Sequence, residues 1–215
     1  MNPIDLAMPA SIRRINLFGC RRSGTNYLGA LLVRNLDVRL TPEAFSFKHD
    51  PPTPRLLAQL AGDKGRDLLC LICVRHPATW MVSRLIWARE NPASGPADAG
   101  FLCRRYNDRY RTWFDLVARH PEHAAWVRYE DLLDDPAACL AGLRRCFPLP
   151  ARGPDFVAVE TRVETGRRVT RAPFDRAAHA LDRYLARLAP ADIQRIRADI
   201  DWKRLASLGY RAEDM

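Results

Sequence analysis

Residues 14–26 read RINLFGCRRSGTN, and this segment decides the fold. Its first five residues are typical of a buried strand, and a helical pattern of leucines begins near Thr25. Two glycines between them, Gly19 and Gly24, let the backbone wrap closely around an oxyanion. The N–H groups at the start of the helix add partial positive charge at the same point. The segment therefore predicts a strand, an anion-binding loop and a helix in succession.

The rest of the chain continues this alternation of strands and helices. Residues 67–74 are apolar on both faces, as in a buried parallel strand, and residues 125–129 are a further strand candidate. A short extended piece is expected at residues 45–49. Helical patterns cover residues 54–61, 77–86, 101–118, 136–146, 174–188 and 190–200. We therefore expect an α/β fold, a three-layer sandwich with a mainly parallel central sheet, built as a single domain over residues 1–215.

The composition limits the class of protein. The chain has 34 Lys+Arg against 25 Asp+Glu, and all but three of the basic residues are arginine. A hydrophobic content of 47% excludes a disordered chain, and no apolar stretch approaches the ~20 residues of a membrane span, so we predict no stable membrane insertion. No signal-peptide pattern is found in residues 1–14, which favours a cytoplasmic protein. The arginines are spread along the chain rather than gathered in a stripe, so we predict no nucleic-acid binding, although a non-enzymatic basic nucleic-acid-binding domain stays as an alternative function.

Cysteine and histidine give no metal signal. Cys70 and Cys73 form a C-x-x-C inside a predicted strand, where residues three apart point to opposite faces. We therefore assign both thiols to core packing. His120 and His123 have no further ligand at zinc-site spacing, and we predict no metal site.

The glycine loop differs from that of P-loop NTPases. The pattern G-x-x-x-x-G-K-[ST] requires Lys and then Ser or Thr, but Thr25 and Asn26 occupy these positions. The cations lie inside the loop instead, as Arg21 and Arg22. This arrangement favours anion binding without the magnesium-binding hydroxyl of a kinase. A P-loop kinase or NTPase stays as an alternative, with the acidic residues after strand 125–129 as its metal ligands.

A second anion site is indicated at the end of the buried strand. Arg75 follows the strand directly, and Ser83 lies eight residues later, about two turns into the next helix. The guanidinium of Arg75 offers a bidentate grip on a phosphate, and Ser83 adds a neutral hydrogen bond. Pairing of Arg75 with a carboxylate is the structural alternative. Two anion sites suit a ligand that carries phosphate at two points.

Three short segments resemble the sulfotransferases that use 3′-phosphoadenosine 5′-phosphosulfate (PAPS). They are the loop Arg22-Ser23-Gly24-Thr25, the Arg75-His76-Pro77 strand end with Ser83, and Tyr129-Glu130-Asp131-Leu132 followed by Pro136. The resemblance implies a P-loop-like phosphosulfate-binding loop. It also implies transfer of a sulfuryl group from PAPS to a hydroxyl or amine of an acceptor, which leaves adenosine 3′,5′-bisphosphate (PAP). The family's bacterial members suggest a carbohydrate or a small metabolite as acceptor. The sequence leaves acceptor and oligomeric state open.

The resemblance also implies roles for individual residues. The donor's 5′-phosphosulfate would lie against the loop, whose residues are Arg21, Arg22, Ser23, Gly24, Thr25 and Asn26. Arg75 and Ser83 would bind its 3′-phosphate. The adenine would contact Tyr129 and stack on Tyr27. Two arginines near the C-terminal end, Arg167 and Arg168, are placed like the family's clamp on the 3′-phosphate.

Catalysis would require a cation and a base. Arg22 is the expected stabiliser of the leaving group. His49 follows Phe47-Lys48 and precedes Pro51, which is similar to the segment that carries the family's catalytic histidine. Glu43 is the alternative base, since some members use a glutamate after the loop.

Overall fold

Four parallel strands form the centre of the molecule. The computed structural model describes residues 11–41, 47–91, 98–159 and 181–215. Within this part of the chain the sheet has the order β2-β1-β3-β4, and each neighbouring pair is parallel. The strands are β1 (Arg14–Phe18), β2 (Arg39–Leu40), β3 (Leu68–Val74) and β4 (Ala124–Arg128). The predicted α/β fold with a parallel sheet is confirmed.

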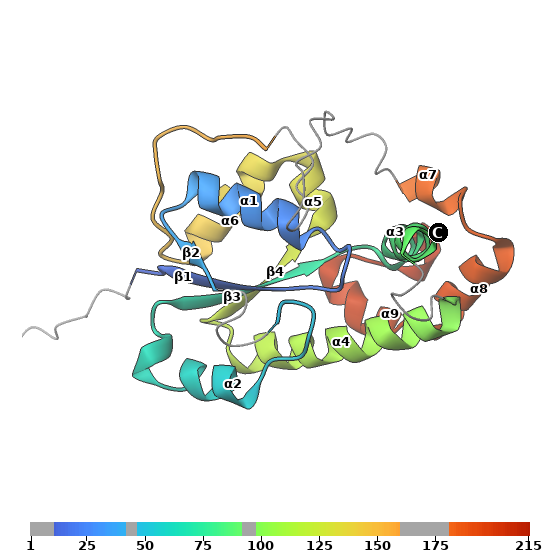
Figure 1. Ribbon diagram of the computed structural model, residues 1–215, viewed down its shortest axis with the longest axis horizontal. Helices are drawn as coiled ribbons and strands as arrows, with labels where there is room; N and C mark the ends of the chain where they lie inside the picture. Colours follow the sequence, from blue (N-terminus) through green and yellow to red (C-terminus); the bar gives the residue numbers. More distant parts are fainter. Residues whose placement is uncertain (1–10, 42–46, 92–97, 160–180) are drawn as a thin grey trace, which may run out of the picture.

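Helices cover both faces of this sheet (Figure 1). One face carries α1 (Thr25–Asn35), α5 (Tyr129–Asp134) and α6 (Pro136–Cys146). The other carries α2 (Pro54–Leu60) and α4 (Ala99–Arg119). The remaining helices gather beyond the carboxyl end of β3 and are α3 (Pro77–Glu90), α7 (Leu181–Leu185), α8 (Pro190–Asp199) and α9 (Trp202–Leu205). None of the described helices is long and apolar enough to cross a bilayer.

The side chains of β3 explain why the sheet is buried on both sides. All seven residues of the strand are buried, and they alternate between two hydrophobic clusters. Cys70 belongs to the cluster under α4, whereas Cys73 belongs to the cluster under α1. The two thiols therefore diverge, as the spacing predicted. Burial raises the pKa of the Cys70 thiol to about 12, which keeps it protonated.

Three local predictions differ from the structure. The strand β2, a two-residue pairing at the edge of the sheet, was not predicted. Of the extended piece predicted at residues 45–49, residues 48 and 49 form a turn, and residues 45–46 lie outside the described residues. The strand predicted to end at residue 129 ends at Arg128, because Tyr129 begins α5. Of the helix predicted at residues 174–188, the described part contains α7 from Leu181 to Leu185.

Candidate functional site

The loop between β1 and α1 has the backbone shape that its glycines permit. Gly24, the N-cap of α1, has a φ of 100°, and a Cβ there would lie 2.2 Å from the ring of Tyr129. Arg22 has a φ of 75°, a left-handed conformation that residues with a side chain adopt at a cost. Strain of this kind is found where surrounding contacts hold a functional loop in one shape.

Contacts from β3 and α3 hold that loop in place. Arg75 Nη1 donates to the carbonyl of Arg22 at 3.0 Å, and the Cys73 thiol donates to the carbonyl of Ser23 at 3.0 Å. The indole of Trp80 donates to the carbonyl of Arg21 at 2.8 Å. Three successive carbonyl oxygens are thus engaged by donors, so their negative ends are partly neutralised beside a potential anion site.

Arg75 lies buried at the carboxyl end of β3 with one donor to spare. Its side chain is 3% exposed, and its Nε donates to Thr79 Oγ1 at 3.0 Å. The guanidinium lies over the rings of Tyr129 and Tyr184, at 4.6 and 5.0 Å from their centroids. Its Nη2 is buried and has no hydrogen-bond partner among the described residues. The carboxylate partner considered as an alternative is not found in this part of the chain.

Arg22 and Ser83 connect the two predicted anion sites. Arg22 Nε lies 3.4 Å from Ser83 Oγ, although the two residues are 61 positions apart in the sequence. The Ser23 hydroxyl is buried and has no partner among the described residues. The structure therefore brings together Arg22, Ser23, Arg75 and Ser83 at the ends of β1 and β3.

His49 lies against the start of the same loop. Its Nδ1 is 2.6 Å from the carbonyl oxygen of Gly19. A carbonyl only accepts hydrogen bonds, so Nδ1 carries the proton and Nε2 keeps a lone pair in the neutral ring. Burial, together with the charges of Lys48 and Arg21, lowers the pKa of His49 to about 4, although the hydrogen bond to Gly19 acts in the opposite direction. The imidazole is therefore neutral at neutral pH, as a general base must be.

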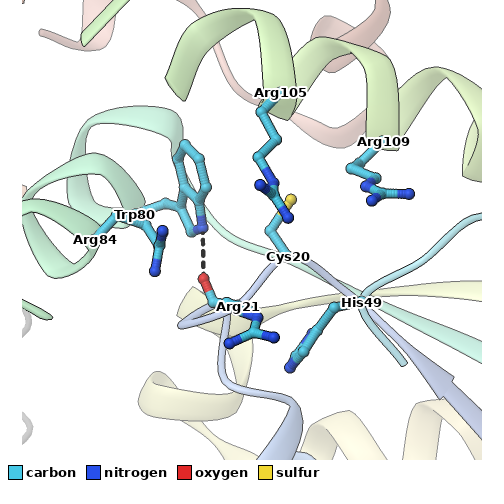
Figure 2. Close-up of a pocket in the computed structure, with 7 residues that line it drawn as sticks. All are labelled: Cys20, Arg21, His49, Trp80, Arg84, Arg105 and Arg109. Carbon is cyan, nitrogen blue, oxygen red and sulfur yellow. Dashed lines mark hydrogen bonds between the residues drawn. The ribbon is translucent and has the colours of Figure 1, made fainter. Parts of the chain in front are cut away.

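A pocket opens beside the loop (Figure 2). We call it the arginine pocket; its lining residues are Cys20, Arg21, His49, Trp80, Arg84, Arg105 and Arg109. Figure 2 shows Arg105 reaching from α4 toward Cys20, with Arg21 and His49 across the pocket. Trp80, Arg84, Arg105 and Arg109 were not singled out from the sequence. The i, i+4 spacing of Arg105 and Arg109 was a signal, but arginine is too frequent in this chain for it to stand out.

The other predicted donor residues lie around the loop. The Asn26 side-chain oxygen accepts a hydrogen bond from Lys48 Nζ at 2.7 Å. Thr25 and Tyr27 are buried on the first turn of α1. The candidate base Glu43 and the candidate clamp residues Arg167 and Arg168 lie outside the described residues.

Glu130 ties the end of β4 to the rest of the site. Its carboxylate accepts hydrogen bonds from the backbone N–H of His76, at 2.9 Å, and from the Tyr210 hydroxyl. Its neighbour Asp131 lies 3.7 Å from Arg128. The sequence motif was assigned a role only through Tyr129, so this bracing role of Glu130 was missed.

Comparison with known proteins does not assign the chain to a family. No protein-family model matches the chain, and no curated protein matches it significantly. Within the described residues, no three His, Cys, Asp or Glu side chains gather as a metal-binding group.

Proposed function

We propose that this protein is a PAPS-dependent sulfotransferase, which transfers a sulfuryl group from PAPS to a hydroxyl or amine of an acceptor and leaves PAP. The observation that carries the proposal is the convergence of two arginines from distant segments. Arg75 Nη1 donates to the Arg22 carbonyl across 53 positions of sequence, at the end of parallel strands where α/β sheets bind ligands. A donor with phosphate at both ends of its ribose suits two such cations.

Unpaired polar atoms at this site fit an anionic donor. Arg75 Nη2 and Ser23 Oγ are buried and lack partners among the described residues. A buried polar group without a hydrogen bond costs about 1–3 kcal/mol, which a bound phosphate oxygen would recover. Arg75 and Ser83 would hold the 3′-phosphate, and the loop with Arg22 would hold the 5′ end. Tyr129 and Tyr27 are the proposed adenine contacts, and Arg167 and Arg168 stay predicted clamp residues.

The chain's own residues would carry the charge and proton movements. The donor supplies a sulfuryl group whose bond to a phosphate oxygen breaks as the acceptor oxygen or nitrogen bonds to sulfur. The electron pair of the broken bond stays on PAP, and Arg22 stabilises that growing negative charge more than the ground state. His49 Nε2 takes the proton from the acceptor. Glu43 is the alternative base. With Arg22 and the loop amides as the positive charge, we propose a reaction that needs no metal.

The low pKa of His49 changes when the donor binds. A pKa of about 4 makes the free imidazole a weak base, chiefly because burial disfavours its charged form. Negative charge placed beside the ring favours the protonated form and raises the pKa. A bound donor therefore strengthens the base at the moment when it is needed.

The kinase alternative is less well supported by the end of β4. Its candidate magnesium ligands would be Glu130 and Asp131. Glu130 is held by His76 and Tyr210, and Asp131 lies beside Arg128. Magnesium binding would therefore have to disrupt the contacts that both carboxylates already make with the protein.

An acceptor screen tests the proposed function. The full chain is incubated with PAPS that carries a labelled sulfuryl group and with panels of sugars, phenols and amines, and the label is followed onto product. We expect transfer to at least one acceptor, and loss of transfer in Arg75→Gln but not in Arg104→Ala, an exposed arginine outside the site. Failure of the wild-type chain to bind PAP or to transfer label to any panel would contradict the proposal.

A further inference from the structure

Positive charge accumulates in the arginine pocket beyond what the donor accounts for. Of the residues assigned to the donor, Arg21 is the one that also lines this pocket. Arg84, Arg105 and Arg109 come from α3 and α4, on the side of the loop that faces His49. The pocket is thus a second part of the site, next to the proposed base.

Most of this charge is not neutralised by the protein. Arg109 forms an ion pair with Asp50, with 2.9 Å between Nη2 and the carboxylate oxygen. Among the described residues, no carboxylate forms an ion pair with Arg21, Arg84 or Arg105. Arg84 and Arg21 instead lie over the same indole, that of Trp87, at 4.7 and 5.9 Å from the ring centroid. This contact stabilises a cation but does not cancel its charge.

Arg84 provides an independent sign of an absent partner. Its side chain is 4% exposed, and its Nη1 is buried without a hydrogen-bond partner among the described residues. Burial lowers the pKa of Arg84, and the charges of Arg105, Arg21 and Arg22 lower it further. A buried guanidinium among like charges is costly unless an anion completes its surroundings.

We propose that the arginine pocket receives the acceptor, and that the acceptor carries an anionic group, a sulfate ester or a carboxylate, close to the hydroxyl or amine that is sulfated. The proposal rests on the proposed sulfotransferase function. Arg84 and Arg105 bind the anionic group, while His49 lies beside the reacting hydroxyl or amine. Both groups of the acceptor would lie against residues that line this one pocket beside the loop.

The test uses the full chain with its donor site filled by PAP. Binding of inorganic sulfate is titrated by calorimetry for the wild type, for Arg105→Ala and for the matched control Arg104→Ala. The two arginines are adjacent on α4 and both exposed, but Arg105 alone of the two lines the pocket. We expect Arg105→Ala to weaken sulfate binding about tenfold or more, as one lost charge-assisted contact would, and Arg104→Ala to leave it unchanged. PAP affinity should be equal in all three.

Label transfer from PAPS then identifies the anionic group. Matched acceptors are compared: glucose with glucose 6-sulfate and with glucuronate, and the neutral 4-hydroxyphenylacetamide with 4-hydroxyphenylacetate. We expect the anionic members to be preferred at least about tenfold, and Arg105→Ala to remove the preference. A preference for the sulfated acceptor or for the carboxylates then shows whether the anionic group of the natural acceptor is a sulfate ester or a carboxylate.

The outcomes separate this proposal from the one on which it rests. If PAP binds and neutral acceptors react as well as anionic ones, or if Arg105→Ala binds sulfate as the control does, the anionic acceptor is wrong and the sulfotransferase stands. If PAP does not bind, the proposed function is wrong and the anionic acceptor falls with it.

Discussion

Arg22 has a strained backbone and is the residue that the proposed mechanism assigns to leaving-group stabilisation. Its φ of 75° would be relaxed in glycine, so the side chain itself must justify the conformation. The guanidinium lies near Ser83, and the backbone carbonyl accepts from Arg75. In the proposed sulfotransferase, this guanidinium is the group expected to stabilise the leaving oxygen.

Removing this side chain should greatly lower turnover without unfolding the chain. Arg22→Ala keeps the left-handed backbone strain of the wild type, whereas Arg22→Gly also relieves it. We expect both variants to lower kcat by about 10²–10³-fold, as loss of one transition-state donor does. Steady-state kinetics and thermal unfolding measure the two effects. Near-normal kcat in Arg22→Gly would show that another group stabilises the leaving oxygen.

Protonation of His49 should make the reaction rate fall at low pH, which gives the rate–pH profile an acid limb. The base must be neutral, and the pKa of about 4 keeps it neutral as the pH falls below the ordinary value of 6.5. The profile of kcat/KM, which reports the free enzyme, should therefore stay flat through 6.5 and fall near pH 4. His49→Gln should lower the rate and remove this limb. An unchanged profile in the variant would assign the base to Glu43.

At the scale of elements, the junction between β1 and α1 determines the site. Gly24 closes the loop against Tyr129, the first residue of α5. Because a side chain there meets the ring as well as an unfavourable φ, the loop and α5 hold their positions together.

Substitution of Gly24 should therefore disturb both stability and donor binding. Gly24→Ala places a Cβ 2.2 Å from the Tyr129 ring at a φ of 100°. We expect a loss of about 1–3 kcal/mol in the free energy of unfolding and a clear loss of PAP affinity. Gly153→Ala is the matched control, because a Cβ there has no atom within 4 Å. Equal behaviour of the two variants in denaturant unfolding and PAP titration would argue against a tight loop.

The sequence predicted the elements whose signals are local. The apolar run of β3, the Pro77 start of α3 and the long helix α4 all appear as expected. The two-residue strand β2 has too few residues for a pattern, and its place comes from pairing with β1. The short helix α5 was missed because Tyr129 follows directly on a strand and was included in it.

Of the candidate site, too, only the residues that belong to local sequence motifs were predicted. Arg22, Arg75 and Ser83 were predicted because each belongs to a short motif with fixed spacing. The arginine pocket was not, because Arg84 and Arg105 lie on different helices that meet only through tertiary packing. A motif describes neighbours in sequence, whereas this pocket is built from neighbours in space.

At the scale of the whole molecule, the arginines behind the net charge of +9 include two groups, those paired with carboxylates and those near the loop. Arginines with carboxylate partners, such as Arg14 with Asp67 and Arg204 with Asp201, serve the surface or the fold. Among the described residues, no carboxylate forms an ion pair with Arg21, Arg84 or Arg105 near the loop. The excess that matters for function is therefore the small group beside His49.

The molecule as a whole should lose stability in mild acid. Burial lowers the pKa of His49 and of His76 from 6.5 to about 4. The unfolded chain therefore takes up protons between these values while the folded chain does not, so the free energy of unfolding falls as the pH drops from 6.5 toward 4. His76 alone accounts for at most about 3 kcal/mol.

His76→Asn isolates this contribution. In the wild type the backbone N–H of Ala78 donates to His76 Nδ1 at the start of α3. Asparagine keeps an acceptor at the cap but does not titrate in this range. Urea unfolding at several pH values should show a smaller acid loss in the variant. An identical pH dependence in variant and wild type would show that His76 is protonated equally in both states.

Equilibrium binding of nucleotides tests the central claim most directly. The full chain is titrated with PAP, with adenosine 5′-monophosphate, which lacks the 3′-phosphate, and with ATP·Mg²⁺. If Arg22 and Arg75 hold a donor phosphorylated at both ends, PAP should bind at least about 100-fold more tightly than either competitor, and Arg75→Gln should remove most of that advantage. Binding of ATP·Mg²⁺ as tight as that of PAP, or tighter, would contradict the account.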